Sequence, residues 1–267
     1  MFADLDLSKR LESAEGHACA QFADSRRRRF PDSGAEWIEC AGAYAVFDTV
    51  DSPVTQTFGL GVFEELTTES LDRIEQFFAG HRAPVFLEMS PHAGVAAFDL
   101  LCTRGYRPVE FSNVMYRPVE NPTVDPPANV SVRIAGDSDS DLWTRVSARG
   151  WAQEQPELLE FLLGFGTIFT GRTDTVCFLA EVDGQPGAAG ALCIHDGVAL
   201  FAGSATVPEL RRRGLQSALL HARMRYAFDS GCDIAEIVVH PGSDSQRNAE
   251  RKGFRIAYTR TKWKLSV

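Results

Sequence analysis

This chain lacks several patterns that identify common classes of protein. It contains neither Gly-x-x-x-x-Gly-Lys-Ser/Thr nor Gly-x-Gly-x-x-Gly, the loops that many nucleotide-binding proteins wrap around phosphates. No window approaches the roughly 18 consecutive apolar residues of a membrane span. The N-terminal residues also lack the basic and apolar segments of a secretion signal. We therefore predict a cytoplasmic protein that does not act in a membrane.

Cysteine is absent from the arrangements in which it usually carries chemistry. The sequence has no Cys-x-x-Cys pair and no histidine at the spacing of a zinc site, so we predict neither a disulfide framework nor a bound metal. We expect the six scattered cysteines to be core thiols: Cys19, Cys40, Cys102, Cys177, Cys193 and Cys232.

The balance of charge excludes a further class. The 267 residues are 44% hydrophobic and 24% charged, as in globular proteins, and the formal net charge is -9. Nucleic-acid-binding domains carry a basic face, so we do not expect nucleic acid to bind. Residues 1–210 hold 15 basic and 31 acidic side chains, whereas residues 211–267 hold 12 and 5. A basic end on an acidic chain predicts a site for one compact anion.

A proline-rich segment divides the chain into two similar parts. Residues 120–129 predict an extended linker between a first domain, residues 1–119, and a second, residues 130–267. Both show a helix, an apolar strand ending at a proline, a second helix, a Gly-aromatic pair and another strand. Pro91 matches Pro241 at an offset of 150, and Gly105 matches Gly253 at an offset of 148. This predicts an internal duplication, with chance recurrence as the alternative.

The second domain has the pattern of an α/β fold. Two Asp-Gly turns join three of its strands into an antiparallel meander. The predicted strands are residues 132–134, 175–182, 188–195, 198–205, 234–240 and 256–265, and the predicted helices are 139–149, 156–165, 212–229 and 244–251.

One stretch of the second domain has the features of an anion-binding site. A strand ends near Thr206, Pro208 stops it, and a helix is predicted to begin at Arg212, within the run Arg211 to Gly214. The first N–H groups of a helix have no internal partner and lie at the positive end of its dipole, so they suit a phosphate. An arginine run alone is usually solvated surface, which is the alternative interpretation.

Two motifs here resemble a known family. Arg211-x-x-Gly214-x-Gln216 resembles the acetyl-CoA-binding signature of the GCN5-related N-acetyltransferases (GNAT), Arg/Gln-x-x-Gly-x-Gly/Ala, with Gln216 departing from the pattern. Residues 245–254 resemble the later helix of that family, which ends in Gly-Phe before a strand. The resemblance covers residues 131–267. It implies two tandem GNAT-like domains, each a mixed, mostly antiparallel sheet flanked by helices.

By this resemblance the protein transfers an acetyl group from acetyl-CoA to an amine by direct attack in a ternary complex. The acceptor would be a small molecule or a peptide, and the protein a monomer or homodimer. The first domain would be a degenerate copy, because residues 58–70 hold three glutamates and no arginine where a pyrophosphate would bind. The resemblance places acetyl-CoA against Ser204, Ala205, Thr206, Arg211, Arg212, Arg213, Gly214, Leu215, Gln216, Ser217 and Asn248.

The groups that would move protons are less clearly marked. Many relatives carry a tyrosine as general acid where this chain has Ala249, so that role cannot be transferred. Ser245 and Asn248 are the nearest polar groups and could bond the cofactor or supply a proton through water; helix capping and solvent exposure are the alternative interpretation. Glu236 and His240 lie on the strand after the cofactor helix and are candidates for the general base, followed by Glu181 and Tyr258.

The missing tyrosine and Gln216 also support a second function. In that alternative the protein is a non-catalytic module that binds or senses acyl-CoA through a degenerate GNAT fold.

Overall fold

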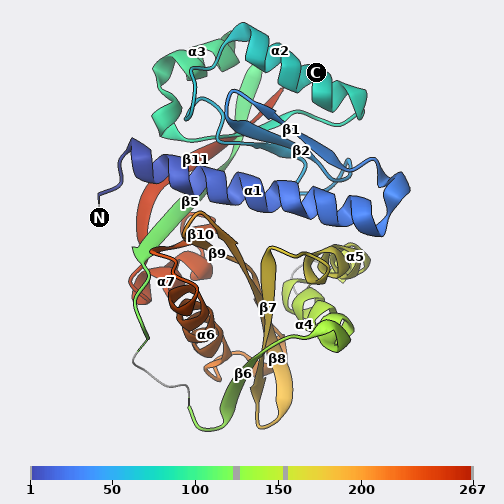
Figure 1. The fold of residues 1–267 in the computed structure, drawn as a ribbon, viewed down its shortest axis with the longest axis vertical. Helices are drawn as coiled ribbons and strands as arrows, with labels where there is room; N and C mark the ends of the chain where they lie inside the picture. The colour runs from blue at the N-terminus through green and yellow to red at the C-terminus, as the bar shows by residue number, and fades with distance from the viewer. Residues whose placement is uncertain (1, 123–126, 153–155, 266–267) are drawn as a thin grey trace. The chain divides into compact units, whose positions relative to one another are not determined.

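The structure, a computed structural model, describes residues 2–122, 127–152 and 156–265. Its contacts divide the chain into two compact units. Unit 1 contains residues 1–117 and 236–267, and unit 2 contains residues 118–235. Both are α/β units with a mostly antiparallel sheet and flanking helices, which confirms the predicted fold class (Figure 1).

Unit 1 begins with a long helix and builds its sheet from both ends of the chain. The β3–β4 pair is parallel, whereas β1–β2, β2–β3, β4–β11 and β11–β5 are antiparallel. The elements are α1 (Leu5–Arg29), β1 (Glu36–Cys40), β2 (Ala43–Phe47), β3 (Gln56–Phe58), α2 (Thr68–Gly80), β4 (Phe86–Met89), α3 (Val95–Thr103), β5 (Tyr106–Pro118), α7 (Asp244–Arg251) and β11 (Arg255–Leu265).

Alternate residues of β2 face two different layers of unit 1. Ala43 and Ala45 point into an apolar core formed with α2, α3 and β4. Tyr44 points toward α1, where a Cβ added to Gly16 would lie 2.6 Å from the tyrosine ring. Glycine in the middle of α1 therefore lets the helix lie close against the sheet. Figure 1 shows α1 running across this sheet.

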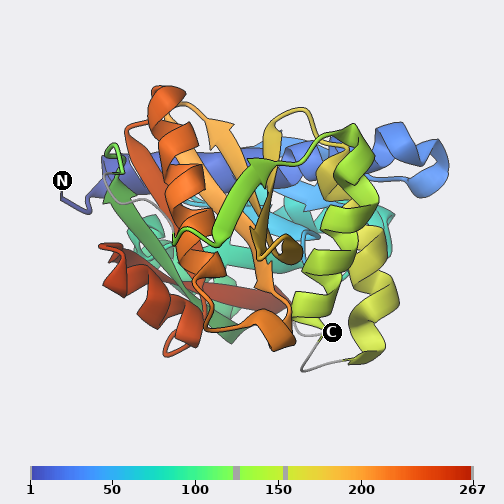
Figure 2. The same cartoon turned by 90° about the horizontal axis from the view of Figure 1, so that it is seen from below.

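Unit 2 is the predicted antiparallel meander with helices on both faces. Its strands follow the order β6-β7-β8-β9, and Figures 1 and 2 show α6 on one face and α4 and α5 on the other. Both Asp-Gly turns have positive φ at both residues, as hairpin turns require. The elements are β6 (Val130–Ile134), α4 (Ser140–Trp151), α5 (Leu159–Thr170), β7 (Thr175–Val182), β8 (Gln185–His195), β9 (Val198–Thr206) and α6 (Leu215–Asp229).

The same order of elements occurs twice, as the duplication predicts. β3-α2-β4-α3-β5 corresponds to β9-α6-β10-α7-β11, where β10 is Ile234–Val239. The compact units differ from the predicted domains 1–119 and 130–267, because β11 pairs with β4 on one side and β5 on the other. The last part of the chain therefore groups with unit 1. Within the predicted linker 120–129, residues 123–126 lie outside the described residues.

Three expectations were wrong in detail. Helix α6 begins at Leu215 rather than Arg212, because Arg212 has a φ of 63° and Gly214 a φ of 88°, which no α-helix accommodates. The second helix of unit 2 continues to Thr170. Cys102 is exposed and Cys19 is half-buried rather than in the core, although Cys40, Cys177, Cys193 and Cys232 are buried.

No helix among the described residues is both long and apolar enough to cross a membrane.

Candidate functional site

The loop between β9 and α6 has an unusual backbone. A short 3-10 turn, Pro208–Leu210, follows the strand, and then Arg212 and Gly214 both adopt the left-handed region, with φ of 63° and 88°. An L side chain at φ near 88° is strained, so position 214 requires glycine. Such alternating backbone conformations turn successive N–H groups toward one concave face, which is a geometry that holds anions.

The N–H groups of this loop are available to a ligand. The first hydrogen bond of α6 is donated by Ala218 N to Gly214 O at 3.0 Å, and Gly214 has no side chain to cap the helix. Within the described parts of the chain, no hydrogen bond occupies the N–H groups from Arg212 to Ser217. Together with the positive end of a 15-residue helix, these donors form a site suited to an anion.

The three arginines of the loop have different roles. Arg211 donates to Thr206 O and Gly150 O, both at 3.4 Å, and so braces the loop against β9 and α4. Arg213 forms an ion pair with Asp183 in the β7–β8 turn. Arg212 is exposed and has no ion-pair or hydrogen-bond partner among the residues that the structure describes. It is therefore the arginine that is available for a bound anion.

Gln216, which departs from the family signature, does not fill the loop. Its side-chain amide donates to Thr206 Oγ1 at 2.7 Å, so the side chain is held against the end of β9. Leu215 is buried beside Gly187, whose missing side chain leaves room for it, and Ser217 is half-buried. The structure thus brings Thr206, Arg211 and Gln216 into one hydrogen-bonded group.

The end of β9 carries a β-bulge next to the loop. Ala189 pairs with Ala205 and Ala191 with Ala202, so Gly203 and Ser204 together lie opposite one residue of β8. Gly203 has a φ of 60°, as a glycine of a bulge often does. The hydroxyl of Ser204 is buried without a partner among the described residues.

Of the remaining predicted residues, Glu181 lies on β7 of unit 2, where it forms an ion pair with Arg133 at 3.3 Å, and the others belong to unit 1. His240 is exposed just after the end of β10, and Ser245 and Asn248 are exposed on α7. The cap of α7 is Ser243, which accepts a hydrogen bond from Gln246 N at 3.1 Å. Capping therefore does not explain Ser245 or Asn248, whereas their exposure agrees with the solvated alternative.

Glu236, in contrast, is fully buried. Neither oxygen of its carboxyl group has a hydrogen-bond partner among the described residues. Burial raises its pKa well above the ordinary value, Glu15 and Glu12 raise it further, and Arg260 opposes the shift. The pKa of Tyr258 is also raised, chiefly by burial, and its hydroxyl donates to Glu12 Oε1 at 2.8 Å.

Arg260 is the cation around which these acidic groups gather. Its Nη1 lies 3.5 Å from Glu12 and 2.5 Å from Glu15, and its Nε lies 3.0 Å from Glu88. Glu12 also accepts from the N–H of Gly59 at 3.1 Å. Gly59 belongs to the loop after β3, which corresponds to the loop after β9. In unit 1, therefore, a carboxylate of the chain itself bonds a loop N–H group.

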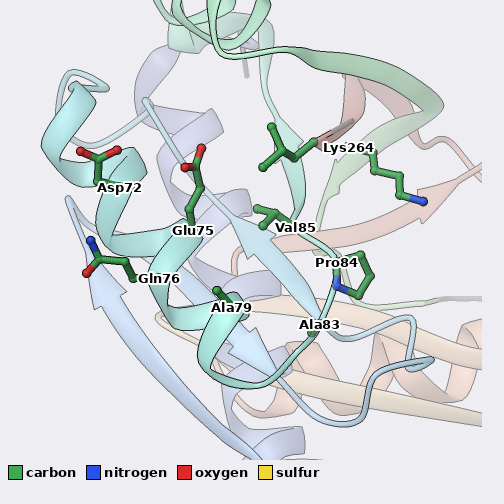
Figure 3. A pocket seen from close by; sticks show the side chains of 9 residues that line it. Asp72, Glu75, Gln76, Ala79, Ala83, Pro84, Val85 and Lys264 are labelled. Atoms are coloured by element: carbon green, nitrogen blue, oxygen red, sulfur yellow. The ribbon is translucent and has the colours of Figure 1, made fainter. Parts of the chain in front are cut away.

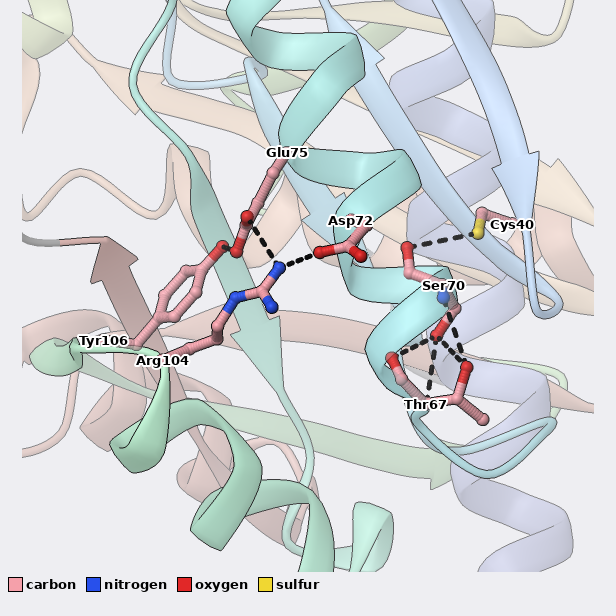
Figure 4. Close-up of polar contacts among 7 residues, drawn as sticks. All are labelled: Cys40, Thr67, Ser70, Asp72, Glu75, Arg104 and Tyr106. Atoms are coloured by element: carbon pink, nitrogen blue, oxygen red, sulfur yellow. Dashed lines mark hydrogen bonds and ion pairs between the residues drawn. The ribbon is translucent and has the colours of Figure 1, made fainter.

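Unit 1 also contains a hollow of about 430 Å³ between α2, the 83–85 segment and the end of β11 (Figure 3). Its acidic groups already have partners: Arg104 pairs with Asp72 and lies 3.0 Å from Glu75, which accepts from Tyr106 OH at 3.2 Å (Figure 4). The acidic groups of the hollow are therefore already engaged, and Lys264 is the other charged residue of its lining. The described residues contain no cluster of His, Cys, Asp or Glu that could hold a metal ion.

Two buried polar side chains near the bulge were not predicted. Trp143 on α4 and Arg223 on α6 are almost fully buried and contact the backbone of β8. Arg223 lies among the buried residues of α6, a position where the apolar stripe of the sequence predicts an aliphatic side chain. The charged side chain of Arg223 within this apolar stripe was the feature of the sequence that could have identified it.

Comparison with known proteins agrees with this geometry. Residues 140–254 match the acetyltransferase (GNAT) family, and the match includes the β9–α6 loop. A search of curated proteins found no match.

Solved structures share the fold over nearly the whole chain. A GCN5-related N-acetyltransferase from Kribbella flavida is 18% identical, with a TM-score of 0.65 over 93% of this chain and 96% of that one. A tandem GNAT protein from the clavulanic acid biosynthesis pathway is 13% identical, with a TM-score of 0.56 over 100% of this chain and 98% of that one. A conserved protein of unknown function from Staphylococcus epidermidis is 8% identical, with a TM-score of 0.63 over 90% and 98%.

Proposed function

We propose that the protein transfers an acetyl group from acetyl-CoA to an amine; residues 140–254 match the acetyltransferase (GNAT) family, and the chain has the fold of a tandem GNAT protein. The observation that carries this proposal is the row of N–H groups from Arg212 to Ser217, which have no partner among the described residues, at the start of α6. A phosphate group is the ligand that such a row binds best.

The residues around the loop fit acetyl-CoA in the proposed role. The pyrophosphate would be held by the backbone of Arg212 to Ser217 and by the side chain of Arg212. The backbone of Ser204, Ala205 and Thr206 would bond the pantetheine arm, and Asn248 stays a candidate cofactor-binding residue. Acetyl-CoA supplies the acyl group as a thioester, whose carbonyl the amine attacks.

Glu236 is the proposed general base, because neither oxygen of its buried carboxyl group has a hydrogen-bond partner among the described residues, and burial raises its pKa above the ordinary value. His240 and Ser245 are the other candidates, for the base and for the proton donor. The loop after β3 in unit 1 is not proposed to bind CoA. Glu12 already accepts from Gly59 N, and Glu64 and Glu65 add exposed negative charge there.

The enzymatic proposal is tested by measuring CoA release from acetyl-CoA across a panel of small amines, amino acids and peptides. We expect release above background with at least one acceptor, and a loss of rate in Glu236→Gln with little change in CoA affinity. If CoA raises the melting temperature while no acceptor supports turnover, the protein is an acyl-CoA-binding module instead. The specific observation behind that second function is Ala249, which is buried where many relatives carry a tyrosine.

A further inference from the structure

Two buried side chains from opposite faces of the unit 2 sheet bond the backbone of β8 at the bulge. Trp143 on α4 donates its Nε1–H to Gly190 O at 3.3 Å and to Phe178 O at 3.1 Å. Arg223 on α6 donates from Nη1 to Ala191 O at 3.2 Å. Figure 2 shows that the two helices cover opposite faces. Two consecutive carbonyls of β8 are thus held by side chains.

The bulge explains why these carbonyls need such partners. Gly190 lies where two residues of β9 face one residue of β8, so the regular ladder is interrupted there. A buried carbonyl without a partner is costly, and Trp143 and Arg223 remove that cost. Gly190 also leaves space: a Cβ added to it would lie 3.2 Å from Arg223 Cζ and 3.4 Å from Ser204 Oγ.

Arg223 is an expensive residue to bury at this place. It is 2% exposed, it has no carboxylate partner among the described residues, and its remaining contacts are Leu219 O at 3.3 Å and the face of Phe201 at 4.8 Å. Burial lowers its pKa to about 9. An apolar side chain of similar volume would be expected to stabilise the core at least as well. The contribution of the guanidinium is therefore local to the bulge.

We propose that Trp143 and Arg223 are positioning residues for acyl-CoA binding. By bonding the two β8 carbonyls, they hold the bulge so that the backbone of Ser204 to Thr206 keeps the spacing that the pantetheine arm requires. This inference rests on the proposed function, because it takes the end of β9 as the place where that arm binds.

The test compares two ligands in the full-length protein by titration calorimetry. 3′,5′-ADP reports on the phosphate-binding loop alone, whereas CoA also reports on the bulge. The variants are Trp143→Phe, which removes one donor and keeps a ring, and Arg223→Met. Each is expected to raise the Kd for CoA about tenfold and to change the Kd for 3′,5′-ADP less than about twofold, because a relaxed bulge is less often in the binding-competent form.

The matched control is Trp263→Phe, since the indole nitrogen of Trp263 is buried without a partner among the described residues. It should leave both affinities unchanged. Hydrogen exchange provides a second readout: the amides of residues 204–206 should exchange faster in Trp143→Phe and Arg223→Met than in the wild type. The melting temperature of Arg223→Met should change by only a few degrees, because removal of a buried cation offsets the loss of the partner of Ala191 O, and this separates a local effect on the bulge from general instability.

The possible outcomes separate this inference from the proposed function. If the wild type binds CoA and both variants bind it equally well, the inference is overturned and the proposed function stands. An equal loss of affinity for CoA and for 3′,5′-ADP would also overturn it, because the effect would not be specific to the bulge. If the wild type binds neither ligand, the proposed function and the inference fail together. Wild-type CoA binding without turnover removes only the catalytic proposal.

Discussion

Replacing Glu12 by glutamine should stabilise the protein relative to the wild type as the pH rises. Glu12 is fully buried, and burial raises its pKa from 4.5 to about 7; Arg260 and the hydrogen bond from Tyr258 oppose the shift, while Glu15 and Glu88 add to it. The folded protein therefore keeps a proton that the unfolded chain releases. The stability of the wild type falls as the pH rises from the unfolded pKa to the folded one, and the variant lacks this loss.

The size of the effect follows from the two pKa values. A difference of one in pKa corresponds to about 1.4 kcal/mol, so the full loss is about 3 kcal/mol, of which about 2.5 kcal/mol falls between about pH 5 and about pH 8. Glutamine also changes the hydrogen bonds to Gly59 and Tyr258, but that change is nearly independent of pH. The quantity to measure is therefore the change with pH of the difference in unfolding free energy between Glu12→Gln and the wild type, rather than that difference at one pH.

The assay is urea unfolding followed by circular dichroism at several pH values. Glu64→Gln is the matched control, because Glu64 is exposed on the same unit. The free energy of unfolding of Glu12→Gln minus that of the wild type should rise steadily with pH, and the control should stay level. If the free energies of unfolding of the wild type and of Glu12→Gln change with pH in parallel, within about 0.5 kcal/mol, buried Glu12 does not hold its proton and the reasoning is refuted.

Two further predictions concern local features of the fold. Thr67→Ala should lower the free energy of unfolding by about 1 kcal/mol, because it removes the side chain that accepts from Ser70 N at 3.2 Å in the capping box of α2. Thermal melting would measure this loss, and an unchanged melting temperature would contradict the prediction. Native protein treated with a thiol reagent should be modified at exposed Cys102 and not at Cys177, whose burial raises its pKa to about 12. Peptide mass mapping before and after denaturation would detect early modification of Cys177, the result that would contradict this.

Local signals made much of the fold predictable. The meander of unit 2 follows from short apolar strands and two Asp-Gly turns, because each depends on residues close together in sequence. Helix α1 was not predicted, since many of its buried residues are small, such as Ala14, Gly16 and Ala18, and give only a weak apolar pattern. The grouping of β11 with unit 1 depends on its pairing with β4 and β5, which are far away in sequence, and no local feature of the sequence predicts that pairing.

The candidate site shows the same division. The position of the loop was predictable, because a strand, a proline, arginines and a glycine mark it within a few residues. The different roles of the arginines were not, since Arg213 is engaged by Asp183 from a distant turn and Arg211 by the carbonyl of Gly150. The boundary of α6 was misplaced because arginine is a good helix former, whereas the loop holds Arg212 in the left-handed region.

The central claim is that the loop before α6 binds the phosphates of acyl-CoA, and calorimetric titration of acetyl-CoA into Arg212→Glu tests it most directly. Arg145→Glu, which changes an exposed arginine on α4 of the same unit, is the matched control for net charge. Arg212→Glu should raise the Kd at least about tenfold and the control less than about twofold. Equal affinity of Arg212→Glu and the wild type would contradict the claim.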